Sequence, residues 1–302
     1  MTIENQLGEV EMAYALPVTV HDAEGSHQVE RETLYEHLMD VYINERLTMK
    51  LICTPEYLPE LVLGRMLTEG IITGTDDVRM IYVCRYGSRA RVLLNRTEKN
   101  DEAQKKTNTI QNTGIVERLD AVQNTGISEN LDETVPDPDA RHQESYIETT
   151  PSCCTGNHIL NDYFTHDIPL YPIKIALPVH NEDIQNLFME FKKDSPLHEK
   201  THATHSAMLY INEKIAFQCE DIGRHNAVDK AIGYALENNL DLKHAMIFTS
   251  GRVPTDMMEK IIRAQIPVLV TKEAPTREAV ILAHEYHVQL IGNVRDGQYC
   301  IY

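Results

Sequence analysis

Residues Glu220–Lys230 form the stretch of this chain that is best suited to bind an anion. The stretch follows an apolar run at Lys214–Cys219 and stands at the start of a helical pattern. A helix N-terminus carries partial positive charge and free backbone N–H groups, so it favours an anionic ligand. Arg224, His225 and Lys230 would add side-chain charge, which predicts a phosphate-binding site here. The alternative is a capped, solvated helix start without a ligand.

A second candidate is the adjacent pair Cys153 and Cys154, in a polar stretch that has neither a strand nor a helix pattern. A thiolate is the nucleophile that can accept a sulfane sulfur and hold it as a persulfide. Such a cysteine has to be accessible, and a polar loop provides that access. The alternative is two incidental loop thiols. The other cysteines lie in apolar, strand-like runs, which predicts small buried hydrophobic side chains at Cys53, Cys84, Cys219 and Cys300.

A third candidate is Ser250-Gly251-Arg252, which follows one apolar run and precedes a helical one. Glycine permits a close approach of the backbone to a ligand, and arginine can hold a phosphate through two hydrogen bonds. The Gly-Lys-Ser/Thr part of a Walker A loop is absent, and a glycine between a strand and a helix is also a routine turn. Alone, this motif is therefore a weak sign of a phosphate site.

Together, these motifs resemble those of the formate dehydrogenase accessory sulfurtransferase family. The match at Glu220–Lys230 is specific, and the shorter matches gain weight from their order along the chain. Thr201–Ala207 resembles the family's Thr-Gly-Gly-x-His-x-Ala segment, with both glycines replaced. The remaining matches are Cys53-Thr54-Pro55, Leu63-Gly64 with Thr68–Ile72, Ser250–Val253 and Ala274–Thr276. The resemblance covers most of the chain except for Glu98–Thr149.

The resemblance implies a sulfurtransferase with Cys153 as the residue that carries the persulfide. Such a protein takes sulfur from a cysteine desulfurase and passes it to a molybdenum or tungsten guanine-dinucleotide cofactor, which is then inserted into formate dehydrogenase. The family often has a Cys-x-x-Cys pair at this place. This chain has Cys-Cys-Thr-Gly instead, with Cys154 in the place of a glycine.

The acceptor that the resemblance implies is the molybdenum bis(molybdopterin guanine dinucleotide) cofactor. Asn293–Gln298 matches a segment that contributes to binding it, although the family's second arginine is Gln298 here. The implied cofactor-binding residues are His205, Arg224, His225, Gly251, Arg252, Asn293, Val294, Arg295, Asp296, Gly297 and Gln298. The implied partners are a cysteine desulfurase, formate dehydrogenase and the cofactor with its guanine nucleotide, and the resemblance leaves a homodimer open.

The 302 residues carry a formal net charge of −18. Such a chain is not expected to bind nucleic acid through a general basic surface, so an anionic ligand needs a local basic pocket. A run of about 18 apolar residues is absent, so we expect no helix that spans a membrane. The first residues are polar and acidic, unlike a secretory signal, and the scattered cysteines do not suggest a disulfide framework. We therefore expect a cytoplasmic protein.

The hydrophobic periodicity predicts an α/β protein in four parts. Residues 1–97 are expected to form a small α/β domain, and residues 98–150 a polar, partly disordered insertion. Residues 151–175 form a cysteine loop and linker, and residues 176–302 a second α/β domain. The elements expected in the first domain are a hairpin at Val41–Ile52 that turns at Asn44-Glu45, a helix from Pro55 to Leu67, and strands at 78–84 and 90–94.

Strands alternate with helices in the second domain, which predicts a mostly parallel sheet with helices on its faces. The expected strands are 207–211, 214–219, 245–249, 268–270, 288–291 and 298–301, and the expected helices are 182–193, 227–237, 255–264 and 276–284. Ligands of such sheets bind beyond the carboxyl ends of the strands, where His225 and Ser250–Arg252 lie. The resemblance adds a cytidine-deaminase-like topology for this domain.

Two other functions stay open. One is a non-catalytic chaperone for the same cofactor, in which Cys153 has no chemical role. The other is a nucleotide hydrolase or deaminase that uses His225 and Glu220. Zinc deaminases hold their metal with a Pro-Cys-x-x-Cys pair, which this sequence lacks, and no further ligands complete a set with His202 and His205. We therefore expect no catalytic zinc.

Overall fold

A computed structural model describes residues 1–95, 158–159, 169–193, 195–295 and 297–302. Cys153, Cys154, Asp296 and the predicted insertion at 98–150 lie outside these ranges, as does much of the predicted cysteine loop and linker. The described parts of residues 1–94 and 148–302 belong to one compact unit.

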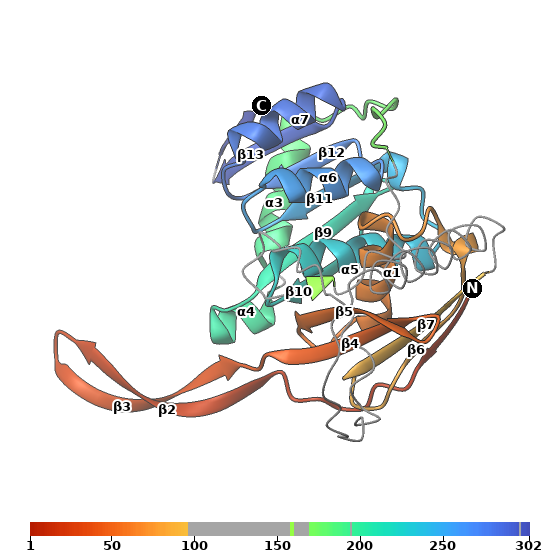
Figure 1. The fold of residues 1–302 in the computed structure, drawn as a ribbon. Helices are drawn as coiled ribbons and strands as arrows, with labels where there is room; N and C mark the ends of the chain where they lie inside the picture. Colours follow the sequence, from red (N-terminus) through yellow and green to blue (C-terminus); the bar gives the residue numbers. More distant parts are fainter. Residues whose placement is uncertain (96–157, 160–168, 194, 296) are drawn as a thin grey trace, which may run out of the picture. The chain divides into compact units, whose positions relative to one another are not determined.

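The described residues form two six-stranded sheets, a separate two-stranded ribbon, and helices that pack on the sheets (Figure 1). The strands are β1 (Thr2–Asn5), β2 (Ala13–Asp22), β3 (Gly25–Leu34), β4 (His37–Ile43), β5 (Arg46–Cys53), β6 (Val78–Val83), β7 (Arg89–Leu94), β8 (His158–Ile159), β9 (His205–Ile211), β10 (Lys214–Asp221), β11 (Ala245–Thr249), β12 (Val268–Thr271), β13 (Gln289–Arg295) and β14 (Gln298–Ile301). The helices are α1 (Leu58–Thr68), α3 (Asn181–Lys193), α4 (Pro196–Thr201), α5 (Arg224–Glu237), α6 (Thr255–Arg263) and α7 (Arg277–Glu285), with short 3-10 turns at Thr75–Asp77 and Leu242–His244. None of the helices in the described ranges is both long and apolar enough to cross a membrane.

The first sheet has the strand order β1-β6-β7-β4-β5-β8. Its β4–β5 hairpin turns at Asn44 and Glu45, whose φ angles of 47° and 63° suit a two-residue hairpin turn. This confirms the hairpin predicted at Val41–Ile52. Helix α1 begins at Leu58, later than the predicted start at Pro55, because Tyr57 has a left-handed φ of 53° that interrupts a right-handed helix.

The second sheet has the order β10-β9-β11-β12-β13-β14 and is mixed rather than mostly parallel. Its central strands β11, β12 and β13 run parallel, whereas β9, β10 and β14 pair antiparallel with their neighbours. Only Asn212 and Glu213 join β9 to β10, and a two-residue turn can connect only antiparallel strands. The predicted strands and helices are present, with both ends as predicted for β11 and β14 and shifted ends for the others. The cytidine-deaminase-like topology stays a prediction.

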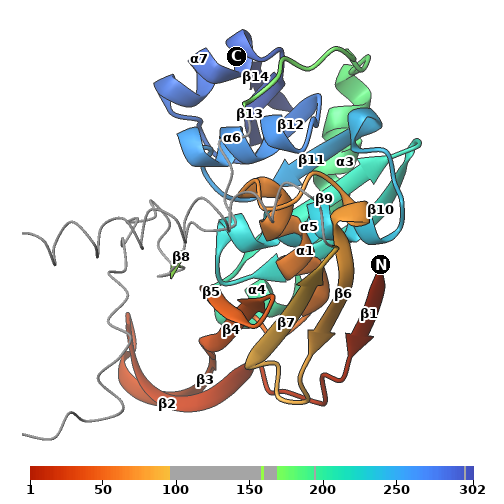
Figure 2. The ribbon, with the colours of Figure 1, turned by 45° about the vertical axis from the view of Figure 1, so that its right-hand side comes forward.

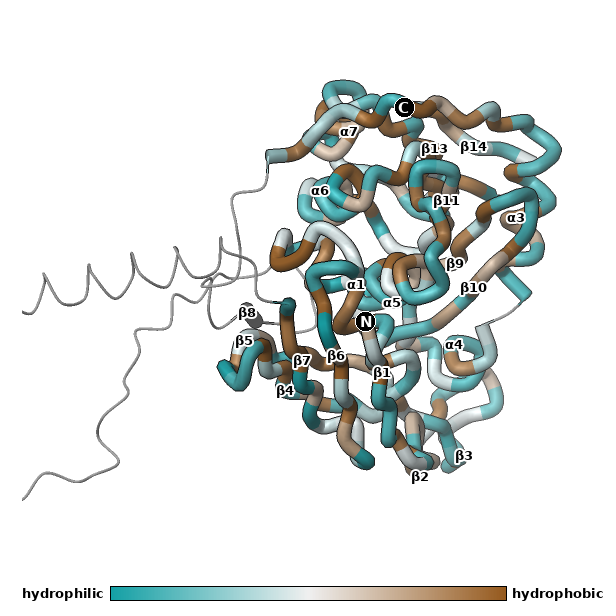
Figure 3. Tube along the Cα trace, turned by 90° about the vertical axis from the view of Figure 1, so that its right-hand side faces the viewer, coloured by the Kyte–Doolittle hydropathy of each residue, from teal (hydrophilic) through white to brown (hydrophobic). Residues whose placement is uncertain are grey.

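Helices cover both faces of the second sheet (Figure 2). Successive side chains of a strand point to opposite faces. In β9, Met208 belongs to a cluster of buried side chains with Phe188 of α3, whereas Leu209 belongs to a cluster with Val228 of α5. Helix α3 therefore packs on one face of the sheet, and α5, α6 and α7 pack on the other. The tube in Figure 3 shows how hydrophobic residues concentrate in the strands between these helices.

Two glycines bring the helix of the first sheet directly against a helix of the second. A Cβ atom on Gly64 of α1 would lie 1.8 Å from the carbonyl oxygen of Asp229, and one on Gly233 of α5 would lie 1.8 Å from that of Glu60. The backbones of α1 and α5 are therefore in contact. One cluster of buried side chains runs from β4 and β5 through both helices to β9 and β11, so the two predicted α/β regions share a core.

Substituting Gly64 by alanine is expected to lower the free energy of unfolding by about 1–3 kcal/mol or more, because the added methyl group has to push α1 away from α5. Gly74→Ala is the matched control, since Gly74 has an extended φ of 179° and a Cβ there would meet nothing within 4 Å. Urea unfolding followed by circular dichroism measures both variants. Equal stability of the two would contradict a backbone contact between the helices.

Strands β2 and β3 are a finding that the sequence pattern did not indicate. They pair with each other over ten residues each, as a sheet of their own. We call this ribbon, Ala13–Leu34, the arm. Figure 1 shows it extending from the start of β4 past the edge of the first sheet. Most of its side chains are exposed.

Candidate functional site

One edge of the second sheet collects the predicted cofactor-binding residues. Strand β9 runs antiparallel to both of its neighbours, β10 and β11, and β12 and β13 run parallel to β11. The amino end of β9 and the carboxyl ends of β10, β11, β12 and β13 are therefore at the same edge of the sheet. We call this side of the sheet the carboxyl edge. The predicted residues that fall in the described ranges there are His205, Arg224, His225, Gly251, Arg252, Asn293, Val294, Arg295, Gly297 and Gln298.

His205 stands at the start of β9, directly opposite Asp221 of β10. Its Nδ1 atom lies 3.4 Å from Ser250 Oγ, which also accepts a hydrogen bond of 2.9 Å from the backbone N–H of Ser206. Ser250 in turn donates its backbone N–H to the Ser206 carbonyl over 3.0 Å. Burial, and then the charge of Arg224, lower the pKa of His205, so it is mostly neutral at pH 7.

The turn after β11 holds Gly251 against Arg224. A Cβ atom on Gly251 would lie 2.7 Å from Cβ of Arg224, so only glycine leaves room for this side chain. The carbonyl of Gly251 accepts a hydrogen bond of 2.7 Å from the Thr271 hydroxyl, which ties this turn to the next one along the edge. At the carboxyl edge, Arg252 is exposed, whereas Arg224 is half-buried and its Nε atom is buried.

His225 lies below the surface rather than on it. Its side chain is 2 % exposed, and its Nε2 atom lies 3.1 Å from Asp256 Oδ2 at the start of α6. Burial lowers the pKa of His225, while the hydrogen bond with Asp256 raises it, and the net direction is downward. The sequence did not indicate Asp256, because hydrophobic periodicity does not predict how α5 and α6 pack against each other. His225 therefore has little surface to offer a ligand.

Asn293–Gln298 spans the end of β13 and the turn into β14. Asn293 has a left-handed φ of 54°, its backbone N–H donates to the Glu273 carbonyl over 3.2 Å, and its side-chain amide donates to the Tyr302 hydroxyl over 2.5 Å. Arg295, Gly297 and Gln298 are exposed. Val294 is fully buried in the cluster under α3, so it packs in the core and cannot line a pocket.

Lys230 does not contribute to the anion site, contrary to the sequence-based prediction. It is fully buried, and its Nζ atom lies 2.7 Å from Asp221 Oδ2 and 2.8 Å from Thr54 Oγ1. Burial by itself would lower the pKa of Lys230, but the adjacent Asp221 carboxylate raises it above its ordinary value. Residue 230 is six positions after Arg224, about 240° further around the helix, so the two side chains face different sides.

Hydrogen bonds between Asp221 and Thr54 connect the motif Glu220–Lys230 to the distant motif Cys53-Thr54-Pro55. Asp221 is fully buried and accepts hydrogen bonds from the Thr54 backbone at 3.1 Å, the Gly223 backbone at 2.8 Å and the Asn226 side chain at 2.8 Å. Asn226 also donates to the Ile52 carbonyl over 2.8 Å. Much of the stretch Glu220–Lys230 therefore forms buried hydrogen bonds that connect the two sheets.

A second buried network joins α1, α5 and α6. Lys260 lies 3.0 Å from Asp229 Oδ2 and donates to the Thr68 hydroxyl over 2.8 Å. The Thr68 hydroxyl donates to Asp229 Oδ1 over 2.8 Å. Arg65 Nε lies 2.9 Å from Glu69 Oε1, and Arg65 Nη1 lies 3.5 Å from Asp229 Oδ2. Asp229, like Asp221 and Lys230, thus serves the packing of the helices rather than the carboxyl edge.

The carboxylate of Glu220 is hydrogen-bonded to the start of the short helix α4. It accepts backbone hydrogen bonds from Leu197 at 2.8 Å and His198 at 2.7 Å, and one from the Thr204 hydroxyl at 2.8 Å. These bonds satisfy the free N–H groups at the start of α4. A general base for a hydrolase or deaminase needs a carboxylate that can reach a substrate proton, and Glu220 has little accessible surface left for that.

The described cysteines fall into two pairs. Cys53 and Cys219 are buried, as predicted, and burial raises the pKa of Cys219 to about 12, so it stays a thiol. The prediction is wrong for Cys84 and Cys300, which are half-buried and exposed, because Cys84 follows the end of β6 and β14 is an edge strand. Among the residues that the structure describes, no three histidine, cysteine or acidic side chains are grouped to hold a metal ion. The absence of catalytic zinc stays a prediction.

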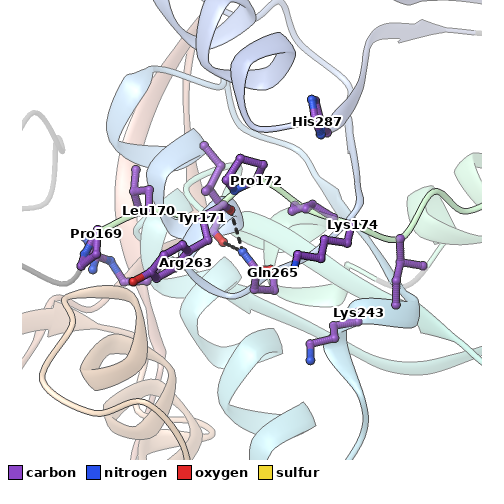
Figure 4. Close-up of a pocket in the computed structure, with 12 residues that line it drawn as sticks. Pro169, Leu170, Tyr171, Pro172, Lys174, Lys243, Arg263, Gln265 and His287 are labelled. Atoms are coloured by element: carbon purple, nitrogen blue, oxygen red, sulfur yellow. Dashed lines mark hydrogen bonds between the residues drawn. The ribbon is translucent and has the colours of Figure 1, made fainter.

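A groove of about 920 Å³ lies away from the carboxyl edge (Figure 4). Lys243, Gln265 and His287 line it, and they precede β11, β12 and β13, so the groove is at the amino ends of these strands. Its other wall is the extended segment 169–175, which is fixed by hydrogen bonds from Gln265 to the Tyr171 carbonyl and from Ile173 to the Tyr286 carbonyl. None of the predicted site residues in the described ranges lines this groove.

The chain is similar to known proteins over most of its length. A sulfur carrier protein FdhD from Listeria monocytogenes is 25% identical over 277 residues, covering 91% of this chain and 90% of its own. The protein of the same name from Bacillus subtilis is 26% identical over 278 residues, covering 91% and 89%. A crystal structure of a formate dehydrogenase accessory protein from Desulfotalea psychrophila superposes with a TM-score of 0.66 over 96% of both chains at 19% identity, which shows that the fold is shared. The model of the FdhD/NarQ family matches residues 34–302, and the chain therefore belongs to that family.

Proposed function

We propose that this protein is a sulfurtransferase that carries sulfur for the maturation of formate dehydrogenase. The observation that carries the proposal is the row of groups suited to an anion along the carboxyl edge, in a chain whose curated relatives are named sulfur carrier proteins. Arg224, Gly251 and Arg252 suit a phosphate, and Asn293 with Arg295 extends the row. A cysteine desulfurase is the proposed donor, and formate dehydrogenase is the proposed recipient of the sulfurated cofactor.

Cys153 is the proposed carrier of the sulfur. Its thiolate attacks the outer sulfur of the donor's persulfide, the sulfur–sulfur bond of the donor breaks, and the donor leaves as a thiolate. Cys153 then holds the sulfane sulfur as a persulfide of its own, with no net oxidation or reduction. Cys153 lies outside the described residues, so this role rests on its sequence match.

The acceptor is proposed to be the molybdenum bis(molybdopterin guanine dinucleotide) cofactor, as a substrate held at the carboxyl edge. Three strand spacings separate β9 from β13 along this edge, which is about 14 Å. An elongated dinucleotide can therefore place one phosphate near Arg224 and Arg252 while its other end reaches Asn293 and Arg295. The formal net charge of −18 would repel a polyanion, so a local row of arginines (Arg224, Arg252 and Arg295) is needed to attract it.

Intact mass spectrometry tests the proposal as a whole. The protein, incubated with a cysteine desulfurase and cysteine at near-neutral pH without added reductant, should gain one sulfur atom, which a thiol reductant added afterwards removes. Peptide mapping should place that atom on the peptide that contains Cys153. A protein that gains no sulfur, while a known carrier in the same mixture does, would contradict the proposed function.

Arg252→Ala should weaken the binding of GDP by about tenfold or more, because one charged hydrogen bond to a phosphate contributes about 1.5–3 kcal/mol. Arg79→Ala is the matched control, since Arg79 is also exposed but lies on β6 of the first sheet. Isothermal titration calorimetry at low salt measures both, and the affinity of the unchanged protein should fall as salt is added. Equal affinities of the two variants would show that the nucleotide binds elsewhere.

A further inference from the structure

The groove at the amino ends of β11, β12 and β13 has the size and the lining of a small-molecule site (Figure 4). Its volume of about 920 Å³ is within the range of about 300–1,000 Å³ that is typical of ligand pockets in proteins. The apolar side chains that line it are those of Pro169, Leu170, Pro172, Ile173, Ile175 and Ile262. Tyr171 adds an exposed aromatic ring. The groove is therefore suited to a ligand with an apolar body.

Hydrogen bonds hold one wall of the groove in place. The side-chain amide of Gln265 donates to the Tyr171 carbonyl over 2.9 Å, and the backbone N–H of Ile173 donates to the Tyr286 carbonyl over 2.9 Å. Gln265 also donates to the Ile262 carbonyl over 3.0 Å, so its amide is fixed against the end of α6. The side chain of Ile173 is buried and anchors the same segment in the core. Because the wall is formed in advance, binding does not have to order it.

Three basic side chains line the groove, each from a different part of the chain. Figure 4 shows Lys174 on the extended segment, Lys243 on the 3-10 turn before β11, and His287 on the turn before β13. Within the described ranges, the ammonium groups of Lys174 and Lys243 form no ion pair. The nearby Asp241 carboxylate accepts the backbone N–H of Lys243 over 3.2 Å and not its ammonium group. No described aspartate or glutamate lines the groove, although the chain has 46 acidic and 28 basic residues, so this is a local basic site on an acidic protein.

Helix dipoles account for only part of this charge. A helix C-terminus carries partial negative charge, which stabilises a cation nearby. This explains Arg263, which also lines the groove, stands in the last turn of α6 and interacts electrostatically with Glu69 and Glu259. It does not explain Lys174, which is on no helix, or Lys243, whose 3-10 turn has only three residues. These two lysines are therefore the groups that a ligand would contact.

We propose that the groove binds a small organic anion, whose apolar body lies on the apolar wall and whose anionic group lies at Lys174 and Lys243. A carboxylate and a phosphate share this chemistry, since both accept charged hydrogen bonds from ammonium groups. A small molecule fits better than a protein partner, because a stable protein interface buries about 1,200 Å² or more, whereas the groove has the volume of a ligand pocket. The site does not rest on sulfur transfer, because none of the described residues of the proposed cofactor site lines it.

Isothermal titration calorimetry of the full chain with sodium 1-naphthoate tests the proposal. This probe joins a carboxylate to an aromatic body, and it should bind with a Kd in the millimolar range or below. 1-Naphthamide has the same rings without the charge and should bind about tenfold more weakly, because a charged hydrogen bond is lost. 1-Naphthyl phosphate, titrated alongside, shows by the tighter affinity whether the site prefers a phosphate or a carboxylate. Equal affinities for naphthoate and naphthamide would overturn the proposal. Failure of both anions to bind would also overturn it and would favour a protein partner for the groove.

Lys174→Met combined with Lys243→Met should weaken the binding of naphthoate about tenfold or more and leave that of naphthamide nearly unchanged. Both lysines are exposed, so the variant should fold, which circular dichroism verifies. Lys193→Met combined with Lys214→Met is the matched control, since it removes two exposed lysines of α3 and β10 that do not line the groove. Equal affinities of the two double variants for naphthoate would contradict the assigned site.

Competition and hydrogen exchange locate the bound probe. Excess GDP should not displace naphthoate, because the groove is at the amino ends of the strands and the proposed cofactor site is at the carboxyl edge. Amides within residues 169–175 should exchange more slowly when naphthoate is bound. Displacement by GDP, or unchanged exchange in this segment, would place the probe elsewhere and overturn the proposal. A protein that binds naphthoate in this way but does not bind GDP would support the groove and contradict the cofactor site, so the two proposals fail separately.

Discussion

Substituting Cys153 by serine is expected to abolish sulfur loading and the maturation of formate dehydrogenase that depends on it. A serine hydroxyl cannot form a persulfide, so no weaker version of the reaction remains. Cys154→Ser is the matched control and should retain most of both activities, because Cys154 stands where the family has a glycine. Mass spectrometry after incubation with a desulfurase measures loading, and formate oxidation by the client enzyme measures maturation.

Adjacent cysteines are poor partners for a disulfide, which is why the two should act independently. Bridged cysteines usually have Cα atoms about 4.4–6.8 Å apart, whereas neighbours in the chain are held at about 3.8 Å. The persulfide on Cys153 should therefore leave by transfer and not by attack from Cys154. Loss of loading in Cys154→Ser alone would mean that the sequence match is displaced by one residue. Normal maturation in Cys153→Ser would favour the cofactor chaperone over the sulfurtransferase.

Substituting Lys230 by methionine is expected to lower the free energy of unfolding by about 3–5 kcal/mol. Methionine fills a similar volume but leaves the Asp221 carboxylate buried without the ammonium group that lies 2.7 Å away. The hydroxyl and carbonyl of Thr54 lose a donor as well, at 2.8 Å and 3.2 Å. Because Asp221 ends a strand of the second sheet and Thr54 directly follows a strand of the first, the variant should unfold cooperatively at a lower urea concentration and not lose one sheet alone.

Two further variants give this experiment its controls. Lys214→Met changes an exposed lysine on β10 and should alter stability by no more than about 0.5 kcal/mol. Asp221→Asn combined with Lys230→Met removes both charges and should recover part of the loss, since no unpaired charge stays buried. A Lys230→Met protein as stable as Lys214→Met would show that the pair is not closed in solution.

The sequence by itself determined the elements and the edge of the sheet where the site residues lie. The periodicity placed the helices and strands of the second domain because apolar residues recur at helix and strand spacing wherever one face is buried. The strand-to-helix turns at Arg224 and Gly251 then had to meet at one edge, because sequential strands that share a direction also share a carboxyl end.

Only the tertiary structure decided which polar groups face that edge and which face the core. Asp221, Asp229 and Lys230 have their partners at Thr54, Thr68 and Lys260, far away in sequence, and no local pattern reveals a contact of that range. The same holds for Asp256 behind His225 and for the close contact at Gly64. The arm was also not predicted, because Pro17 stands inside the strand pattern of β2 and β3 is mostly polar.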